Sequence, residues 1–518
     1  MREYAPVLRT LSSALLLCAL FLMVGGDLPP HPFGFTGARH LLVALSWPWL
    51  YLMLLGLSVL FALAARRTLR DDLASLRALR FLRGPVTYLT AALLLSALLS
   101  SEASLSLVGF GYYLMVFCLL LLFQVRLREA DPDHLWRVIA LAALFLAART
   151  TWWRLDEGLG TLAGQVRNNA WLGKLQIAWV LGLLAPASFG RFLSSSDKRW
   201  RSLFLAAWLL SGVAIIVLWA KTGIAAFAIS AVLMCALNVA SWRRWLPPVA
   251  GIVLVAALAG QGTLSPSGAI PDPAGRLALE SSSALRLRIW QESFRMFLDH
   301  PLTGIGVGTY DALAYTKYPT KEDVGPGGRN WFYMKGWHAH NVFVQVLAET
   351  GLLGFLAWMY LLGTLAVYFL RAWRTAGSEE TRIHAASMIC CLVSFVLLAQ
   401  TEDMLAVRVH ESLRMNLTLW ITLLLGIRTV SRYRESPGGR QSTSVPPGLP
   451  EAAGGARPTP AVGGNSPGTA AVMIARVCYT PRQPLLPRAD LATGRPDPRR
   501  EEIRRMRGSY PGSTEAET

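Results

Sequence analysis

Apolar runs near twenty residues long recur along this chain from Leu8 to Val430, with short basic stretches between them. A helix of about 20 residues spans the roughly 30 Å hydrocarbon core of a bilayer. Of the 518 residues, 53% are hydrophobic and only 16% are charged, which is too apolar for an ordinary soluble domain. The chain is therefore predicted to be all-α, a polytopic membrane helical bundle.

About twelve transmembrane helices are predicted, which puts both termini on the same side of the membrane. The first run follows Arg2 and Arg9, yet no small-residue cleavage site precedes Gly25, so a retained helix is expected rather than a signal peptide. The expected spans cover approximately residues 8–25, 41–65, 84–101, 105–125, 135–152, 169–189, 203–220, 222–240, 246–262, 341–370, 383–401 and 412–430.

The formal net charge of +18 raises the question of a nucleic-acid partner. Most basic residues instead lie between the apolar runs, on alternate connections, so no nucleic acid is expected. By the positive-inside rule these connections and both termini are cytoplasmic. The residues are Arg66, Arg67, Arg70, Arg77, Arg80, Arg83, Arg126, Arg128, Arg191, Lys198, Arg199, Arg201, Arg243, Arg244, Arg371 and Arg374.

The chain divides by composition into four regions. Residues 1–262 hold the first nine predicted spans, 263–340 a large loop on the opposite side, and 341–432 the last three spans. Residues 433–518 are rich in Pro, Gly, Ser, Thr and Arg, so we expect a disordered basic cytoplasmic tail, either solvated or touching anionic lipid headgroups. No cysteine lies in the long loop, and no cysteines have the spacing of a metal site. Neither a disulfide framework nor a metal is therefore expected.

Residues 284–301 of the large loop carry apolar residues at helical spacing and predict an amphipathic helix at the membrane face. Arg286 lies four residues before Trp290, so the two side chains share one face of this helix. Arg288 is two positions from Arg286 and therefore on another face, where it is expected to meet lipid phosphates.

Glycines stand at alternate positions just after this helix, at Gly304, Gly306 and Gly308. Without a Cβ atom they allow the backbone to approach another group closely. Two interpretations remain open from the pattern: a segment that approaches a ligand, or an ordinary connection to the next membrane helix.

The loop ends in Trp337-His-Ala-His-Asn341, directly before an apolar run. Asn341 is a natural N-cap, which places His340 at the mouth of a membrane helix, with His338 two residues earlier as possible support. The free N–H groups there favour neutral imidazole, which can act as a base. A plain interfacial histidine is the alternative.

His340-Asn341, followed after nine residues by Gly351-Leu-Leu-Gly354, resembles the signature of the bacterial O-antigen ligases and their relatives, the O-antigen polymerases and pilin O-oligosaccharyltransferases. Arg286-Leu-Arg-Ile-Trp290 and His300-Pro-Leu-Thr-Gly-Ile-Gly306 are similar to the large periplasmic loop of that superfamily. The resemblance covers roughly residues 284–360 by motif and the remaining spans by hydropathy alone.

The resemblance implies a multi-pass enzyme of the bacterial inner membrane with a periplasmic active site. It would move a glycan from undecaprenyl diphosphate to a hydroxyl of the lipid A core, without a metal or another cofactor. His340 would take the acceptor proton, and Arg286 would hold the donor diphosphate. These residue types suit the chemistry, because a hydroxyl needs a base and a diphosphate leaving group needs a cation.

One position departs from the superfamily pattern. Ligases usually carry a second arginine near the outer end of an earlier helix, and the matching place here reads Trp219-Ala-Lys-Thr-Gly223. Lys221 keeps the charge but loses the planar fork of arginine. Either Lys221 serves in its place, or the nearby Arg167 supplies the fork, or the chain is a divergent member of the superfamily. We favour Lys221 with help from Arg167.

The closest alternatives are an O-antigen polymerase, which needs the same donor site, and a protein O-oligosaccharyltransferase. A lipid-linked glycan transporter is an alternative of another class. Transporters tend to place charges and broken helices at the bilayer midplane, often in repeated halves. Here the spans carry few charges and the polar residues gather in one exterior loop, which favours surface chemistry.

Overall fold

A computed structural model describes residues 5–25, 48–64, 76–127, 131–156, 171–218, 220–238, 286–287, 289–316, 338–401, 405, 407 and 411–435. Contact clustering divides the chain into units of residues 1–445 and 446–518, and all described residues lie in the first. These residues form helices and turns and contain no strand, which confirms the all-α class.

The predicted spans coincide with helices, except that the span 246–262 lies outside the described residues. Arg167, Arg288 and residues 436–518 also lie outside them. Eight of the described helices are long and apolar enough to cross a membrane, and shorter apolar stretches are Thr10–Gly25 in α1, Leu52–Phe61 in α3 and Lys221–Leu237, which is α10. The full number of spans therefore stays a prediction. The elements are α1 (Ala5–Gly25), α3 (Pro48–Ala64), the 3-10 helix η1 (Leu76–Leu82), α5 (Arg83–Leu99), α6 (Ala103–Leu127), α7 (Pro132–Asp156), α8 (Trp171–Ser194), α9 (Lys198–Val217), α10 (Lys221–Leu237), α13 (Tyr310–Thr316), α14 (Val342–Arg374), α15 (Glu379–Leu398) and α16 (Glu411–Glu435).

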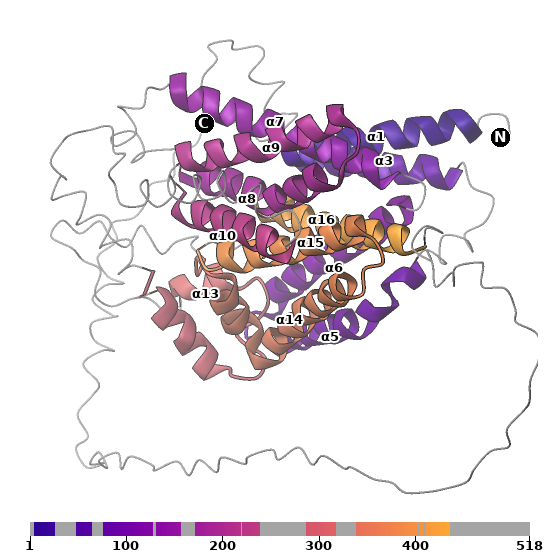
Figure 1. Ribbon diagram of the computed structural model, residues 1–518. Helices are drawn as coiled ribbons and strands as arrows, with labels where there is room; N and C mark the ends of the chain where they lie inside the picture. The colour runs from indigo at the N-terminus through magenta and orange to yellow at the C-terminus, as the bar shows by residue number, and fades with distance from the viewer. Residues whose placement is uncertain are drawn as a thin grey trace, which may run out of the picture. The chain divides into compact units, whose positions relative to one another are not determined.

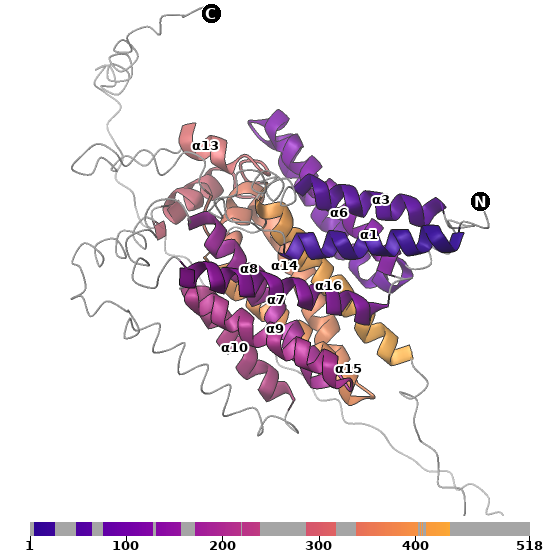
Figure 2. The same ribbon diagram turned by 90° about the horizontal axis from the view of Figure 1, so that it is seen from above.

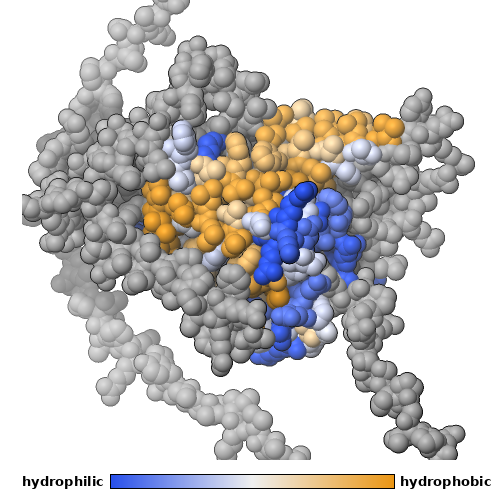
Figure 3. All heavy atoms as spheres, turned by 45° about the horizontal axis from the view of Figure 1, so that its top comes forward, coloured by the Kyte–Doolittle hydropathy of each residue, from blue (hydrophilic) through white to orange (hydrophobic). Residues whose placement is uncertain are grey.

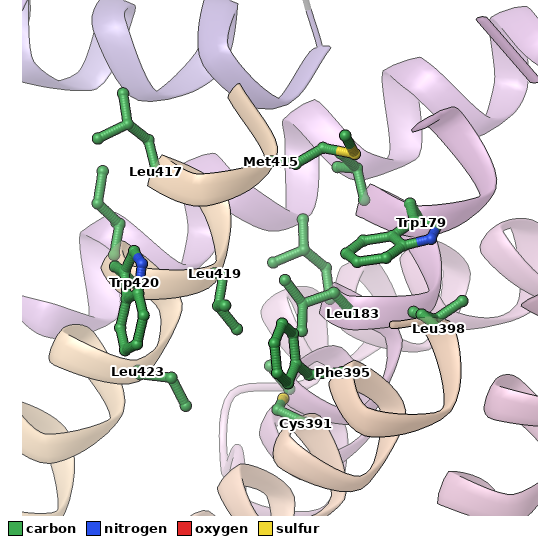
Figure 4. Packing of buried hydrophobic residues seen from close by; sticks show 14 of the residues in the cluster. Trp179, Leu183, Cys391, Phe395, Leu398, Met415, Leu417, Leu419, Trp420 and Leu423 are labelled. Carbon is green, nitrogen blue, oxygen red and sulfur yellow. The ribbon is translucent and has the colours of Figure 1, made fainter. Parts of the chain in front are cut away.

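Helices α8, α15 and α16 pack against one another in the centre of the bundle (Figures 1 and 2). Most of their residues are buried, because other helices surround them on several sides. Figure 4 shows apolar side chains from the three helices gathered there, among them Leu183, Phe395 and Leu419. Close packing rather than the hydrophobic effect is expected to hold these helices together within a bilayer.

The outer helices expose large apolar side chains, such as Leu98 of α5 (57% exposed), Val108 of α6 (67%) and Phe145 of α7 (47%). The face seen in Figure 3 carries a broad apolar surface with hydrophilic residues beside it. A contiguous apolar exterior of this kind is unfavourable in water and favourable in lipid. Together with the long apolar helices, it indicates a multi-pass membrane protein.

The two ends of α15 distinguish the two ends of the bundle. Near its start, Nη1 of Arg191 in α8 lies 3.2 Å from Nε2 of His384. Just past its end, the Ala399 carbonyl accepts a hydrogen bond from the Val342 N–H at the start of α14 (2.9 Å). A helix of 20 residues is about 30 Å long, so the predicted cytoplasmic Arg191 and the first turn of α14 lie at opposite ends.

Helix α14 is broken at Gly351, within a stretch predicted as one continuous span. Gly351 has φ 62° and ψ −164°, which is non-helical backbone that only glycine adopts without strain. A break inside a membrane helix frees backbone N–H and C=O groups, and these must find other partners because lipid offers none.

The segment of residues 301–308, called here the glycine segment, supplies those partners. It accepts hydrogen bonds from the two N–H groups after the break and donates to the two carbonyl groups before it, so these four groups have backbone partners. The bonds run from Leu352 to Pro301 (2.9 Å), from Leu353 to Leu302 (3.1 Å), from Ile305 to Ala348 (3.0 Å) and from Gly306 to Glu349 (2.9 Å).

The glycines of both motifs permit this close backbone contact. A Cβ atom on Gly304 would lie 2.3 Å from the Glu349 carbonyl carbon, and one on Gly351 would lie 2.4 Å from that of Leu302. A Cβ atom on Gly306 would lie 2.2 Å from the Ser100 hydroxyl oxygen. In the structure, these glycines therefore approach other parts of the protein, which is closer to the second of the two interpretations left open above.

We predict that Gly351→Ala destabilises the protein by about 1–3 kcal/mol, because alanine disfavours the positive φ and its Cβ atom has no room. Gly363→Ala is the matched control in the same helix, since nothing lies within 4 Å of a Cβ atom there. Thermal unfolding in detergent measures both variants. Equal melting temperatures for Gly351→Ala and Gly363→Ala would contradict this explanation of the break.

Candidate active site

Residues 289–299, called here the surface helix, form a helix as predicted, and residues 286–287 before it are also helical. Ile289, Ser293 and Met296 are buried at the spacing of one helical face, whereas Leu298 on another face is 70% exposed. The buried face packs on α13 and on the residues around Ala339. That the surface helix lies at the membrane face stays a prediction.

Two hydrogen bonds attach the surface helix to the rest of the site. The Trp290 indole N–H donates to the carbonyl oxygen of Ala339 (2.8 Å), between the two histidines in sequence. The hydroxyl groups of Ser293 and Tyr310, the first residue of α13, lie 2.6 Å apart. Arg286 is half-buried one helical turn before Trp290, so the face shared by Arg286 and Trp290 meets the segment that carries His340.

His340 has a left-handed backbone with φ 49°, the one positive φ of a residue other than glycine among the described residues. Such a conformation is uncommon for side chains with a Cβ atom, although histidine tolerates it better than most. The rings of His338 and His340 are 4.4 Å apart between centroids. His338 is buried, and His340 is partly exposed.

Asn341 is the N-cap of α14, as predicted. Its Oδ1 accepts hydrogen bonds from the N–H groups of Phe343 (3.0 Å) and Val344 (3.2 Å). Its Nδ2 lies 3.3 Å from Oε1 of Gln400, just beyond α15. The cap therefore fixes the first turn of α14 and joins it to α15, immediately after His340.

Lys221 is the exposed first residue of α10. Helix α10 packs along α15, the helix whose end meets the start of α14 (Figure 1). Arg167 and Arg288 lie outside the described residues, so their predicted parts stay predictions. The structure thus joins the surface helix, through Trp290, to the segment that holds His338, His340 and Asn341.

Two further side chains belong to this site and were not predicted from the sequence. Gln345 and Glu349 of α14 are each 4% exposed. The Ala339 N–H donates to Oε1 of Gln345 (3.0 Å), whose Nε2 donates to Oε1 of Glu349 (3.1 Å). A signal was present, because polar residues four apart inside an apolar membrane helix usually have a specific task.

One comparison with known proteins covers this part of the chain. Residues 192–359 match the family described as O-antigen ligase, which confirms the resemblance of the chain to the O-antigen ligase superfamily. The matched part includes α9, α10, the surface helix, the glycine segment and the break in α14. The family points to a glycosyltransferase-like enzyme. No curated protein matches the chain.

We predict that Trp290→Phe loosens the segment of residues 338–341, because it removes the hydrogen bond to Ala339 and keeps an aromatic ring. A bond of this kind contributes about 1 kcal/mol, so amide exchange there should be about fivefold faster. Trp152→Phe, at a 64% exposed position of α7, is the control. Unchanged exchange in Trp290→Phe would show that the surface helix does not hold the segment.

Proposed function

We propose that this protein is a ligase-type glycosyltransferase that moves a glycan from undecaprenyl diphosphate to a hydroxyl group of the lipid A core. The attachment of the surface helix to the His340 segment through Trp290 carries the proposal, together with the family match. The enzyme would lie in the bacterial inner membrane with both termini cytoplasmic and this site on the periplasmic side.

His340 is the proposed general base. An acceptor hydroxyl oxygen attacks the anomeric carbon of the donor, and its proton passes to a neutral imidazole nitrogen of His340. The bond between the anomeric carbon and the diphosphate oxygen breaks, and undecaprenyl diphosphate leaves. His340 is partly exposed at the mouth of α14 but both of its ring nitrogens are buried, so an acceptor hydroxyl would have to enter the site to reach them.

Arg286 is the proposed partner of the donor diphosphate. Negative charge grows on the diphosphate as it leaves, and the planar guanidinium group can pair with two phosphate oxygens. Lys221 or Arg167 would add a second cation, Lys221 as a point charge rather than a fork. His338 would support His340, and Arg288 would meet lipid phosphates at the membrane surface.

An O-antigen polymerase or a protein O-oligosaccharyltransferase would use the same donor site with a different acceptor. A lipid-linked glycan transporter is the alternative outside enzymes. The break in α14 resembles the broken helices of transporters, but its freed backbone groups pair with the glycine segment. This pairing favours a structural reason for the break over a passage through the bilayer.

We predict that His340→Asn abolishes glycan transfer, lowering its rate by about 10² to 10⁴-fold, as expected for loss of a general base. Asparagine tolerates the left-handed backbone at this position, so the fold should persist. The measurement is the O-antigen ladder on lipopolysaccharide gels from a ligase-deleted Gram-negative host that makes the matching glycan.

His134→Asn is the matched control, because His134 is exposed beside Asp131 at the start of α7, near the opposite end of the bundle. Wild type and His134→Asn should restore the ladder. A ladder from well-expressed His340→Asn would remove His340 as the base. No ladder from membrane-inserted wild type would favour the polymerase or oligosaccharyltransferase alternative.

We predict that Arg286→Lys weakens donor use, because lysine keeps the charge but loses one of two paired hydrogen bonds. A hydrogen bond to a charged group is worth about 1.5–3 kcal/mol, so the donor KM should rise about tenfold or more. Arg295→Lys is the control on the same helix, where the exposed Arg295 pairs with Glu292 (2.7 Å). A rise in donor KM equal in both variants would argue against a diphosphate site at Arg286.

A further inference from the structure

Two buried polar side chains of α14, Gln345 and Glu349, have no part in the chemistry proposed above. They lie four residues apart, on one face of the helix. Each is 4% exposed, although burial of amide and carboxyl groups in an apolar helix is unfavourable unless they are paired. We call them the Gln345–Glu349 pair.

The Glu349 carboxyl group is surrounded by donors. Its Oε2 accepts from the Gly308 N–H (3.1 Å), and its Oε1 accepts from Gln345 Nε2 (3.1 Å) and from the Tyr310 N–H (3.4 Å). Both carboxyl oxygens accept here, so the Gln345 amide presents its NH2 group to Glu349. The amide oxygen of Gln345 is thereby directed to the Ala339 N–H, 3.0 Å away.

Ala339 is completely buried between the two histidines. Its N–H is held by Gln345, and its carbonyl oxygen is held by Trp290. The peptide groups on both sides of Ala339 are therefore fixed in orientation. A left-handed backbone at a residue such as His340 persists only where its surroundings hold it in place.

We propose that Gln345 and Glu349 are positioning residues, which hold the His340 imidazole in its working orientation through Ala339. The inference rests on the proposed role of His340. Because Glu349 also accepts from Gly308, the pair connects the glycine segment, which closes the break in α14, to the base. Neither side chain touches the reacting atoms.

Glu349→Gln tests the direction of these hydrogen bonds with little change of shape. The new amide has only one acceptor oxygen, so either the Gly308 N–H on one side or Gln345 and the Tyr310 N–H on the other lose their acceptor. We expect kcat to fall about 100-fold, because small displacements of a catalytic group have effects of that size. The donor KM should stay within about twofold, because Arg286 keeps its place.

The double variant Gln345→Glu/Glu349→Gln keeps the wild-type net charge and again offers acceptors to the Ala339 and Gly308 N–H groups, while the bond within the pair now runs from residue 349 to residue 345. The carboxylate at 345 accepts from the Ala339 N–H and from the amide at 349, whose oxygen accepts from the Gly308 N–H. We expect kcat to recover at least tenfold over Glu349→Gln. Glu292→Gln, a buried carboxyl group of the surface helix outside the pair, is the matched control and should keep wild-type kcat.

Wild-type kcat in Glu349→Gln, or no recovery in a folded double variant, would overturn the proposal. Amide exchange at Ala339 gives a second readout that needs no turnover: faster in Glu349→Gln and restored in the double variant. If the wild type transfers no glycan, the proposed function fails, and the exchange measurement alone then decides whether the pair holds the His340 segment.

Discussion

The backbone hydrogen bonds between the glycine segment and the break in α14 are the constraint on which the site depends. A membrane helix can break only where other groups pair with its freed N–H and C=O groups. Here two N–H groups and two carbonyl groups are paired by residues 301–306, and glycines on both sides allow the contact. Because the surface helix precedes this segment directly, the same bonds bring it to the mouth of α14.

The site then assembles around Ala339. Trp290 holds its carbonyl group from the surface helix, Gln345 holds its N–H from α14, and Asn341 caps the helix two residues later. His340 therefore sits in a left-handed conformation that its neighbours impose. In the proposed function, an imidazole held in this way would deprotonate a hydroxyl, and Arg286 of the surface helix would pair with a diphosphate.

The helices were predictable because bilayer thickness fixes the length of apolar runs, and the described part of the chain agrees. The structure also confirms Asn341 as the N-cap of α14, whereas the roles that the motifs suggest for His340 and Arg286 stay predictions. The break at Gly351 was not predicted, because it depends on a partner segment about fifty residues earlier in the chain, which hydropathy cannot report. The sequence pattern left open what the alternating glycines approach. The roles of Gln345 and Glu349 were not predicted, because their hydrogen bonds to the Ala339 segment are visible only in the structure.

The most direct test of the account is an experimental structure of the protein in lipid with an undecaprenyl-diphosphate-linked glycan bound. The account predicts the diphosphate against Arg286 at the end of the bundle that holds the glycine segment, with the anomeric carbon on the side of His340. A donor bound elsewhere in the bundle, with its diphosphate away from both residues, would contradict the proposed site.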